Sequence, residues 1–379
     1  MKHISATWIF VLAALISSCA DKALAPEREA TQPLILQEIT NAALDSFLLK
    51  MVSEEHFKGV VLAKAGGKVL HAKGYGMATE TTPNSVSTKF HVASITKQFT
   101  ATGIMQLLEA GKIDLEQSIN KFLPLKYTSK SWDNVTIHHL LSHTSGIEDY
   151  ALTRDYYDVE KGFCLGNTVD GMLKEAMGKE LKFTPGSQFS YSNIGFTLLG
   201  HIIEQQSEMA YHQYIQTQIL EPLGMNSSFI HTPEYAHSAG EALGYRWDDE
   251  LNKHVFDDVV SLPVTEADGG LVTTLADFLT WTSIYTDSHQ EILEASSLSK
   301  MTTPYIENGF RSIAESTPSY GYGLSLADGI ISHPGYIVGF RSHFIVDTKA
   351  GLKVLVFSNN VSKSPKNVSI GIYEILRAE

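Results

Sequence analysis

The chain is poor in basic residues, with 29 lysines and arginines against 42 aspartates and glutamates and a formal net charge of −13. It contains no cluster of basic residues that could neutralise a row of phosphates, so no nucleic-acid partner is expected. A Gly-x-Ser-x-Gly motif is also absent, which excludes the sharp strand-to-helix turn on which α/β-hydrolases carry their nucleophilic serine. No tract is repetitive or compositionally biased, and the composition is typical of a globular protein.

Cysteine is almost absent, because Cys19 and Cys164 are the only two in the chain. Cys19 belongs to an N-terminal segment that we expect to be lipidated or removed, which leaves Cys164 without a partner. The sequence therefore predicts no disulfide.

Long apolar runs are scarce as well. The N-terminal run Trp8–Ile16 is shorter than the roughly 20 residues that a membrane-spanning helix needs, so a permanent transmembrane helix is the weaker interpretation. With Lys2 before it and small residues after it, the run is typical of an export signal.

Two processing sites follow this run. Residues 16–19, Ile-Ser-Ser-Cys, are similar to the lipobox of bacterial lipoproteins, in which the cysteine is acylated and becomes the mature N-terminus. The small residues Ala23–Ala25 offer an ordinary cleavage site instead, but Pro26 follows them directly. We favour a lipoprotein signal peptide over 1–19 and a polar tether over 20–33. The protein is then exported to the periplasm or cell envelope, and the lipid anchor at Cys19 is its only membrane contact.

Strand and helix patterns occur near both ends of the folded part, which we expect over residues 34–379. This length is more than one hydrophobic core usually serves, so two units with a cleft between them are expected. An amphipathic helix is predicted over 34–52, followed by two strands joined at Gly66-Gly67. Two more strands surround a turn at 349–351, and a helical pattern begins at Ser369.

Helical patterns dominate the middle of the chain. Residues 101–112 end at a glycine typical of a helix C-terminus, and 193–207 carry apolar residues at i, i+3 and i+4 spacing. The sequence thus predicts an α/β unit formed by 34–103 and 223–379, with an all-helical unit over 104–222 inserted into it.

Ser94 and Lys97 stand three residues apart at the start of a helical pattern, in the stretch FHVASITKQF. Residues at this spacing share one helix face, with Cβ atoms about 5 to 6 Å apart. A serine hydroxyl needs an adjacent base to become a nucleophile, and a lysine can serve if burial lowers its pKa. Because Ser-x-x-Lys also occurs by chance, the pair requires partners elsewhere in the chain.

Tyr191 and Asn193 lie in an irregular stretch between a Thr-Pro-Gly turn and a helix. Residues two apart in extended backbone point to the same side, so both side chains can face a cleft. The alternative is that Ser192 or Asn193 caps the helix and the tyrosine ring serves packing only.

His333 ends a strand pattern that Pro334 and Gly335 interrupt. Proline cannot donate a hydrogen bond to a sheet, so this strand is expected at a sheet edge, where an extended substrate can lie beside it. The alternative is a histidine before a simple turn.

Together the three motifs resemble those of the penicillin-recognising serine hydrolases. Ser94-Ile95-Thr96-Lys97 corresponds to Ser-x-x-Lys, Tyr191-Ser192-Asn193 to Tyr-x-Asn, and His333-Pro334-Gly335 to the Lys/His-Thr-Gly element, in the same order. With the stretches LLSHTSGI, EPLGMNSS and DGGLVTT, the similarity is strongest to the branch of class C β-lactamases, D-stereospecific serine peptidases and related esterases. It implies a β-lactamase/transpeptidase-like fold. In this fold an antiparallel sheet flanked by helices meets an inserted helical domain at the active site.

The resemblance also implies roles for individual residues. Ser94 attacks a carbonyl carbon, Lys97 takes or shares its proton, and Tyr191 relays that proton to the leaving group. Whether the lysine or the tyrosine is the base stays open. The backbone N–H groups of Ser94 and Tyr336 form the oxyanion hole, and Asn193 holds the substrate amide. No cofactor or metal is implied.

The third motif departs from its relatives, since His333 and Pro334 provide neither a fixed cation nor a hydroxyl for a substrate carboxylate. This favours an esterase or peptidase over an efficient β-lactamase or carboxypeptidase. Arg341 is a candidate carboxylate ligand instead, and the alternative is a solvated strand face.

Two functions of different class remain from the sequence. One is a serine hydrolase that cleaves an amide or ester of a small molecule or peptide, including peptidoglycan fragments or β-lactams. The other is a binding or sensing domain that is acylated slowly without turnover. The histidines of HHLLSH, residues 138–143, are interpreted as structural, because no acidic residue is placed as a clear ligand beside them.

Overall fold

The computed structural model describes residues 32–149, 157–158, 162–163, 168–232, 234, 236–257, 266–287, 291–310, 313, 316–361 and 365–378. The predicted signal peptide over 1–19, nearly all of the predicted tether over 20–33, and both Cys19 and Cys164 lie outside the described residues. Within the ranges given above, no helix combines the length and the apolar character needed to cross a bilayer.

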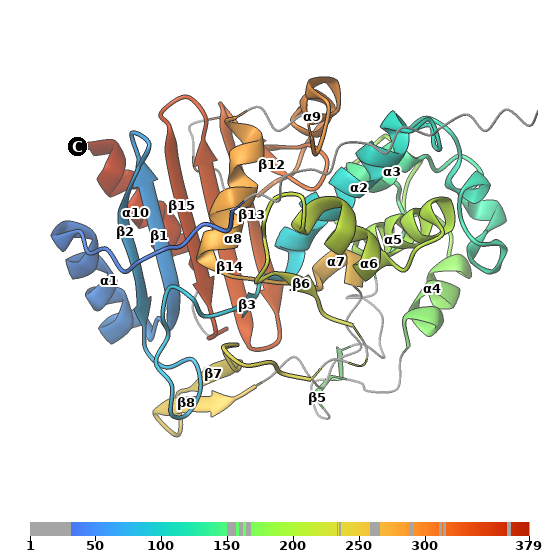
Figure 1. Cartoon of the computed structure of the whole chain (residues 1–379). Coiled ribbons are helices and arrows are strands. Elements are labelled where there is room, and N and C mark those ends of the chain that lie inside the picture. The colour runs from blue at the N-terminus through green and yellow to red at the C-terminus, as the bar shows by residue number, and fades with distance from the viewer. Residues whose placement is uncertain are drawn as a thin grey trace, which may run out of the picture.

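An eight-stranded antiparallel sheet forms one half of the molecule (Figure 1), in the order β10-β11-β12-β13-β14-β15-β1-β2. Pairing of β1 with β15 joins the two ends of the chain in this sheet, and the hairpins predicted at Gly66-Gly67 and at 349–351 are confirmed. The strands are β1 (Gly59–Ala65), β2 (Lys68–Tyr75), β10 (Ile306–Glu307), β11 (Ser319–Tyr320), β12 (Ser325–Ala327), β13 (Ile330–Ile337), β14 (Phe340–Asp347) and β15 (Leu352–Ser358).

The two faces of this sheet enter two different hydrophobic cores. Successive side chains of a strand point to opposite faces, so on β15 Val354 and Val356 pack under the helices α1 (Ala42–Glu55) and α10 (Pro365–Ala378). Leu355 and Phe357 point to the other face and join the larger core. That core also contains buried residues of α2 (Lys97–Glu109) and α8 (Leu275–Trp281).

Helices form the other half of the molecule, at the right of Figure 1, where α5 packs against α2. The helices are α3 (Ile137–Leu141), α4 (Val169–Met177), α5 (Asn193–Ser207) and α6 (Tyr211–Ile215), which runs on into a π-helical turn, Gln216–Leu220. Between the halves lie the small sheet β3 (Phe90–His91), β9 (Leu271–Thr273) and β6 (Phe229–Ile230), and the helix α7 (Glu266–Gly269). The remaining elements are β4 (Tyr157–Asp158), β5 (Gly162–Phe163), β7 (Tyr245–Asp248), β8 (Lys253–Phe256) and α9 (Ala295–Met301). The domain boundaries at 104 and 222 stay a prediction.

The helix predicted over 34–52 begins later and ends later than expected, because α1 spans Ala42–Glu55. Ile39 exchanges two backbone hydrogen bonds with Ala72 of β2 at 3.0 and 2.8 Å, so Ile39 belongs to an isolated bridge and not to the helix. The helix begins at Ala42. Asn41, the residue before it, caps the helix by accepting a hydrogen bond from the Leu44 amide.

The prediction that the His333 strand lies at a sheet edge is wrong for the strand as a whole. β13 lies between β12 and β14, and its pairing with β14 continues through Pro334 and Gly335. Its pairing with β12 ends at Ser332, because β12 is only three residues long. From His333 onward, β13 therefore pairs with a neighbour on one side only.

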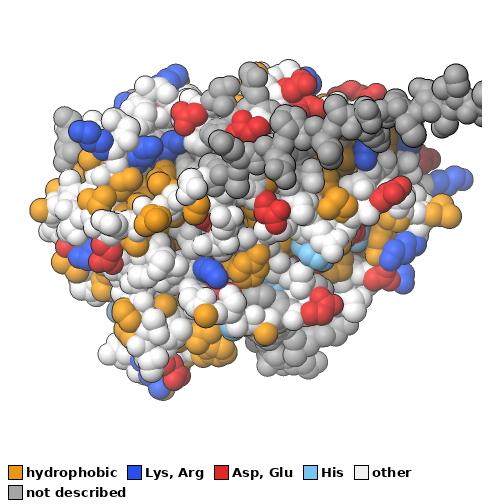
Figure 2. Space-filling model, viewed as in Figure 1, with side chains coloured by type: hydrophobic (Ala, Val, Ile, Leu, Met, Phe, Trp, Pro, Cys, Tyr) orange, Lys and Arg blue, Asp and Glu red, His pale blue; other side chains and the backbone are white. Residues whose placement is uncertain are grey.

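Charged side chains of both signs are interspersed over the face shown in Figure 2, where they do not gather into one patch of either sign. This view agrees with the mixed and mildly acidic composition of the chain.

Candidate active site

Ser94 lies in a single 3₁₀ turn, Ala93–Thr96, directly before α2 begins at Lys97. From the sequence, Ser94 is expected in the first turn of an α-helix. The geometry differs because Ala93 has a φ of 51°, in the left-handed region that non-glycine residues rarely occupy. The Thr96 hydroxyl holds the turn by donating to the Ala93 carbonyl at 2.7 Å and accepting from the Leu271 amide at 2.9 Å. Strain of this kind is common where a reactive side chain is presented.

The Lys97 side chain is buried and brings its amine to Ser94. Its Nζ lies 3.1 Å from Ser94 Oγ, 2.7 Å from Asn193 Oδ1 and 2.7 Å from the backbone carbonyl of Asp268. Burial lowers the pKa of Lys97 to about 8, although the carboxylates of Asp268 and Asp149 oppose the shift. A neutral amine is therefore accessible near neutral pH.

The three neighbours of the amine determine how a neutral Lys97 is oriented. The amide oxygen of Asn193 and the carbonyl of Asp268 can only accept hydrogen bonds, and a neutral amine has two N–H donors. With both donors engaged, the lone pair of Nζ is directed to Ser94, whose hydroxyl can donate to it. This is the arrangement that general-base activation of a serine requires.

Asp149 fixes the orientation of Asn193. Its carboxylate accepts hydrogen bonds from Asn193 Nδ2 at 2.9 Å and from the Asn193 backbone amide at 2.7 Å, at the start of α5. A negative group is favourable at this position because the first amides of a helix lack helical partners. The amide nitrogen is thereby turned to Asp149 and the amide oxygen to Lys97. Asn193 is also predicted to hold a substrate amide, and within the described part of the chain its Nδ2 donates only to Asp149, which leaves one N–H for that role.

The ring of Tyr191 also lies beside the Lys97 amine, with its centroid 4.9 Å from Nζ. Its hydroxyl is buried near Ser94 and has no hydrogen-bond partner within the described residues. Burial raises the pKa of Tyr191 well above its ordinary value; the Ser94 hydroxyl opposes this, and the carboxylates of Asp268 and Asp149 add to it. The phenol therefore stays protonated over the range in which Lys97 titrates. Ser192, between the two predicted site residues, caps α5 by accepting from the Gly195 amide.

The buried ring of His143 packs against Tyr191, with ring centroids 4.1 Å apart. Its Nδ1 accepts a hydrogen bond from the Ser192 amide at 3.2 Å, so it positions the segment that carries the tyrosine. His138 and His139 have other partners: the first lies 2.8 Å from the Tyr322 hydroxyl, and the second helps cap α3. These contacts agree with the interpretation of the three histidines as structural.

His333 is buried and neutral. Its Nδ1 lies 2.6 Å from the Pro334 carbonyl, which can only accept, so Nδ1 carries the proton and Nε2 accepts from the Tyr320 hydroxyl at 2.8 Å. Burial, together with the nearby charge of Lys97, lowers the pKa of His333 to about 3. The side chain is therefore not a cation for a substrate carboxylate.

Gly335 allows β13 to lie against the segment before Ser94. A Cβ atom at Gly335 would lie 2.2 Å from the Val92 carbonyl oxygen and 2.2 Å from Ser342 Oγ, so only glycine fits. The Ser342 hydroxyl donates to the same carbonyl at 2.7 Å. This contact brings the backbone of Tyr336 close to the Ser94 turn, while the Tyr336 side chain itself is exposed.

The structure does not bring the Arg341 side chain to Ser94. Arg341 pairs with Tyr336 across β13 and β14, and its guanidinium lies over the Tyr336 ring at 4.7 Å. Because side chains alternate, Arg341 shares its face of the sheet with His343, which contacts Ser369 of α10. Ser342 points to the opposite face, toward Val92. The role of Arg341 in recognising a substrate carboxylate stays a prediction, and the orientation of its side chain does not favour it.

Asp149 and Asp268 are the site residues that the motifs did not identify. Asp149 follows the stretch LLSHTSGI by two residues, and Asp268 opens DGGLVTT. Both stretches carried the resemblance without any assigned role, and that resemblance is the only sequence signal that could have drawn attention to these two aspartates.

Known proteins are similar to this chain in sequence and in structure. A family model described as Beta-lactamase matches residues 44–377. Penicillin-binding protein 4* of Bacillus subtilis (strain 168) is 31% identical over 334 residues, which cover 83% of this chain and 70% of that protein. Protein flp of Staphylococcus aureus (strain MW2) is 26% identical over 86% of this chain, and the match spans 64% of the length of that protein.

Solved structures show the same architecture. The octameric penicillin-binding protein homologue from Pyrococcus abyssi has a TM-score of 0.78 and 29% identity, over 89% of this chain and 77% of that chain. A D-stereospecific amidohydrolase from Streptomyces sp. has a TM-score of 0.71 and 25% identity, over 87% and 98%. The predicted resemblance and the β-lactamase/transpeptidase-like fold are thus confirmed, and this chain belongs to the β-lactamase family of penicillin-recognising serine hydrolases.

Proposed function

We propose that this protein cleaves an amide or ester bond of a small molecule or peptide through an acyl-enzyme on Ser94. Its family supports a serine hydrolase in general, and the particular reaction is inferred from the site. The observation that carries the proposal is the buried amine of Lys97. Two acceptors bind this amine, and it lies 3.1 Å from Ser94 Oγ.

Acylation begins with neutral Lys97. Ser94 Oγ forms a bond to the substrate carbonyl carbon while its proton passes to Lys97 Nζ, and the carbonyl electron pair moves to the oxygen. The backbone N–H groups of Ser94 and Tyr336 are proposed to stabilise this oxyanion. A donor of this kind typically lowers the barrier by ~2.7 to 4 kcal/mol.

Loss of the leaving group requires a proton. The tetrahedral intermediate collapses, its bond to the leaving nitrogen or oxygen breaks, and Tyr191 donates its phenolic proton to that atom. The proton held by Lys97 then restores the phenol. This assigns the base to Lys97, because Tyr191 has a raised pKa and Lys97 a lowered one. Deacylation repeats the steps with water as the nucleophile and Ser94 as the leaving group.

A substrate without a carboxylate next to the scissile bond suits this site best. His333 is neutral and buried, Pro334 has no hydroxyl, and Arg341 lies on the other face of the sheet. The proposed activity is therefore that of an esterase or a peptidase of neutral substrates rather than that of an efficient β-lactamase.

Turnover of two substrates that differ only in charge tests this proposal. An acyl-D-alanyl-D-alanine peptide and its C-terminal amide would be compared by kcat/KM, and we expect the wild type to prefer the amide. His333→Lys should shift the ratio toward the carboxylate by about tenfold or more, since a hydrogen bond between charged groups contributes about 1.5 to 3 kcal/mol. Arg341→Lys should leave the ratio unchanged. A wild type that prefers the carboxylate, and loses this preference in Arg341→Lys, would refute the assignment.

A slowly acylated penicillin-binding domain is the competing function, and the name of the Bacillus subtilis relative supports it. It predicts a stable adduct with a penicillin and no turnover of either peptide. We also propose that the protein is exported and anchored by a lipid on Cys19, on the basis of the N-terminal sequence.

A further inference from the structure

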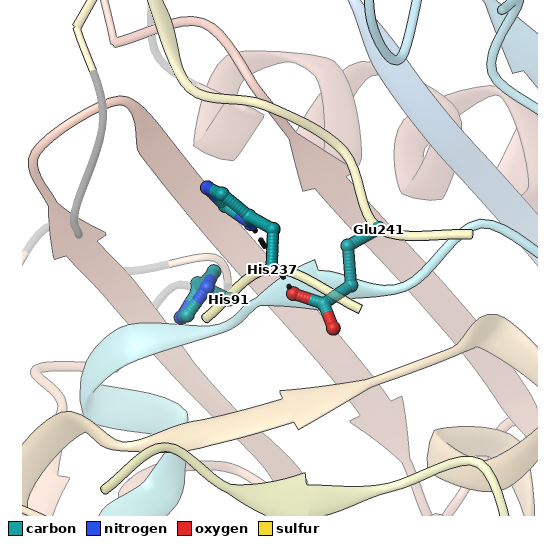
Figure 3. Close-up of side chains that lie close together, drawn as sticks. All are labelled: His91, His237 and Glu241. Atoms are coloured by element: carbon teal, nitrogen blue, oxygen red, sulfur yellow. Dashed lines mark hydrogen bonds and ion pairs between the residues drawn. The ribbon is translucent and has the colours of Figure 1, made fainter. Parts of the chain in front are cut away.

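A second group of chemically reactive side chains lies where the loop 237–241 passes strand β3 (Figure 3). His91 ends β3, and His237 and Glu241 come from that loop, which precedes β7. One nitrogen or oxygen from each of the three side chains lies within 4.8 Å of the other two. None of the three belongs to the residues described around Ser94.

The backbone segments that carry the three side chains are hydrogen-bonded to neighbouring segments. The Lys89 amide donates to the Gly240 carbonyl at 2.9 Å, and the Ala242 amide donates to the Lys89 carbonyl at 3.0 Å. These two bonds hold the loop against the residue before β3, and His91 is itself paired with Val272 of β9. The donor atoms are therefore close together before any ligand arrives, which lowers the entropic cost of binding one.

The carboxylate of Glu241 is oriented for a ligand role. Its Oε1 accepts a hydrogen bond from the Ser238 amide at 3.0 Å and another from the Ser238 hydroxyl. Its Oε2 lies 3.4 Å from His237 Nδ1, on the side of the histidines. A carboxylate with one oxygen held by the protein and the other turned to imidazoles is the arrangement common around protein-bound metals.

The cluster is largely buried, and only one of its three side chains is partly exposed to solvent. His91 is 1% exposed and Glu241 4%, while the His237 side chain is 24% exposed and leaves a route for an ion to enter. The rings of His231 and Phe340 lie 5.2 and 5.0 Å from the His91 ring and form the inner wall.

Two imidazoles and one carboxylate are ligands that Zn²⁺ accepts at about 2.0 to 2.2 Å. In a tetrahedral site the donor atoms are then about 3.4 Å apart. Since the three donor atoms already lie within 4.8 Å of one another, small side-chain rotations bring them to that spacing. Imidazole ligands also disfavour Mg²⁺ and Ca²⁺, which prefer oxygen.

We propose that His91, His237 and Glu241 bind one divalent transition-metal ion of the zinc type, with water as a fourth ligand. The ion would join the loop 237–241 to β3, and the turn that carries Ser94 begins two residues after that strand ends. Its role is structural, because it links two segments of the chain in the folded state only, and such an ion stabilises the fold by mass action.

Calorimetric titration of the metal-free full chain with zinc chloride tests the proposal. We expect one equivalent to bind to the wild type, with a rise in the midpoint of thermal unfolding. His237→Gln and Glu241→Gln should each weaken binding by more than tenfold and remove the thermal shift. His201→Gln is the matched control, because His201 and Glu204 form a similar histidine–carboxylate pair at 2.8 Å outside the cluster. That variant should bind zinc as the wild type does.

Either of two results would overturn the proposal. In the first, the wild type binds no stoichiometric zinc. In the second, both cluster variants bind zinc with wild-type affinity. In either case the cluster contains a His237–Glu241 contact but is not a metal site. If Glu241→Gln does not fold, the partly exposed His237 decides the question alone. Hydrolysis of an ester by metal-free His237→Gln at the wild-type rate would show that this variant is folded.

Discussion

The carboxylate of Asp149 holds the side-chain amide of Asn193 in the one orientation that presents an oxygen to Lys97. Asp149 Oδ2 accepts from Asn193 Nδ2 at 2.9 Å, and Asn193 Oδ1 accepts from Lys97 Nζ at 2.7 Å. A flipped amide would bring two N–H donors to the amine and repel its N–H groups. Asp149 is thus a positioning residue for the proposed base, because it acts on Lys97 through Asn193.

Asp149→Ala should lower kcat/KM for an ester by about 10- to 100-fold, because it removes a charged hydrogen-bond acceptor on which Asn193 depends. The Asp149 charge raises the pKa of Lys97, so its removal should also shift the pH–rate profile to lower pH. The profile of the variant measures this shift. Asp170→Ala, at the exposed first turn of α4, is the control and should change neither quantity. If activity falls but the pH–rate profile does not shift, Asp149 only caps α5 and does not influence the pKa of Lys97.

The rate of acylation should rise with pH. Protonated Lys97 cannot accept the Ser94 proton, and its pKa is lowered to about 8, so the fraction of neutral amine grows up to that pH and then levels off. Below pH 8 the pre-steady-state acylation rate should therefore increase by about tenfold per pH unit. A rate that is flat between pH 6 and 9 would contradict the assignment of Lys97 as the base.

Tyr191→Phe should affect substrates according to their leaving groups. An amide or alkyl ester needs a proton on its leaving atom, whereas nitrophenolate leaves without one. We expect kcat/KM to fall by about 10²- to 10⁴-fold for an anilide and by much less for a nitrophenyl ester. Parallel assays with the same acyl group measure the difference. Equal losses on both substrates would show that the tyrosine ring only packs against His143 and Lys97.

Gly335→Ala should disrupt the site through a steric clash. The new Cβ would lie 2.2 Å from the Val92 carbonyl oxygen, so β13 must move away from the Ser94 turn. A displacement of about 1 Å can reduce activity by about 100-fold, and overpacking typically costs about 1 to 3 kcal/mol of stability. Activity and urea unfolding would be compared with those of Gly178→Ala, where the nearest neighbour is 3.5 Å away. Wild-type behaviour of Gly335→Ala would show that this contact is not required.

The sequence predicted those parts of the site that depend on local geometry. Ser94 and Lys97 meet because residues three apart in a helical turn share one face, and this needs no knowledge of the fold. The hairpins at Gly66-Gly67 and 349–351 are likewise set by the turn residues between two strand patterns.

Features set by pairing between distant segments could not be predicted in this way. The face on which Arg341 lies depends on its register with Tyr336, and a shift of one residue would have placed it on the side of Val92. The interior position of β13 depends on the short strand β12, which has no clear sequence pattern. Asp149 acts on Asn193 only after the chain has passed through α4 and returned to the same place at the start of α5.

The most direct test of the account is the intact mass of the protein after rapid acid quenching of its reaction with a small activated ester. We expect one equivalent of acyl group on the wild type, which decays as the ester is consumed. We expect no adduct and no turnover in Ser94→Ala. An adduct of the same mass on Ser94→Ala, or undiminished hydrolysis by that variant, would contradict the account and place the nucleophile elsewhere.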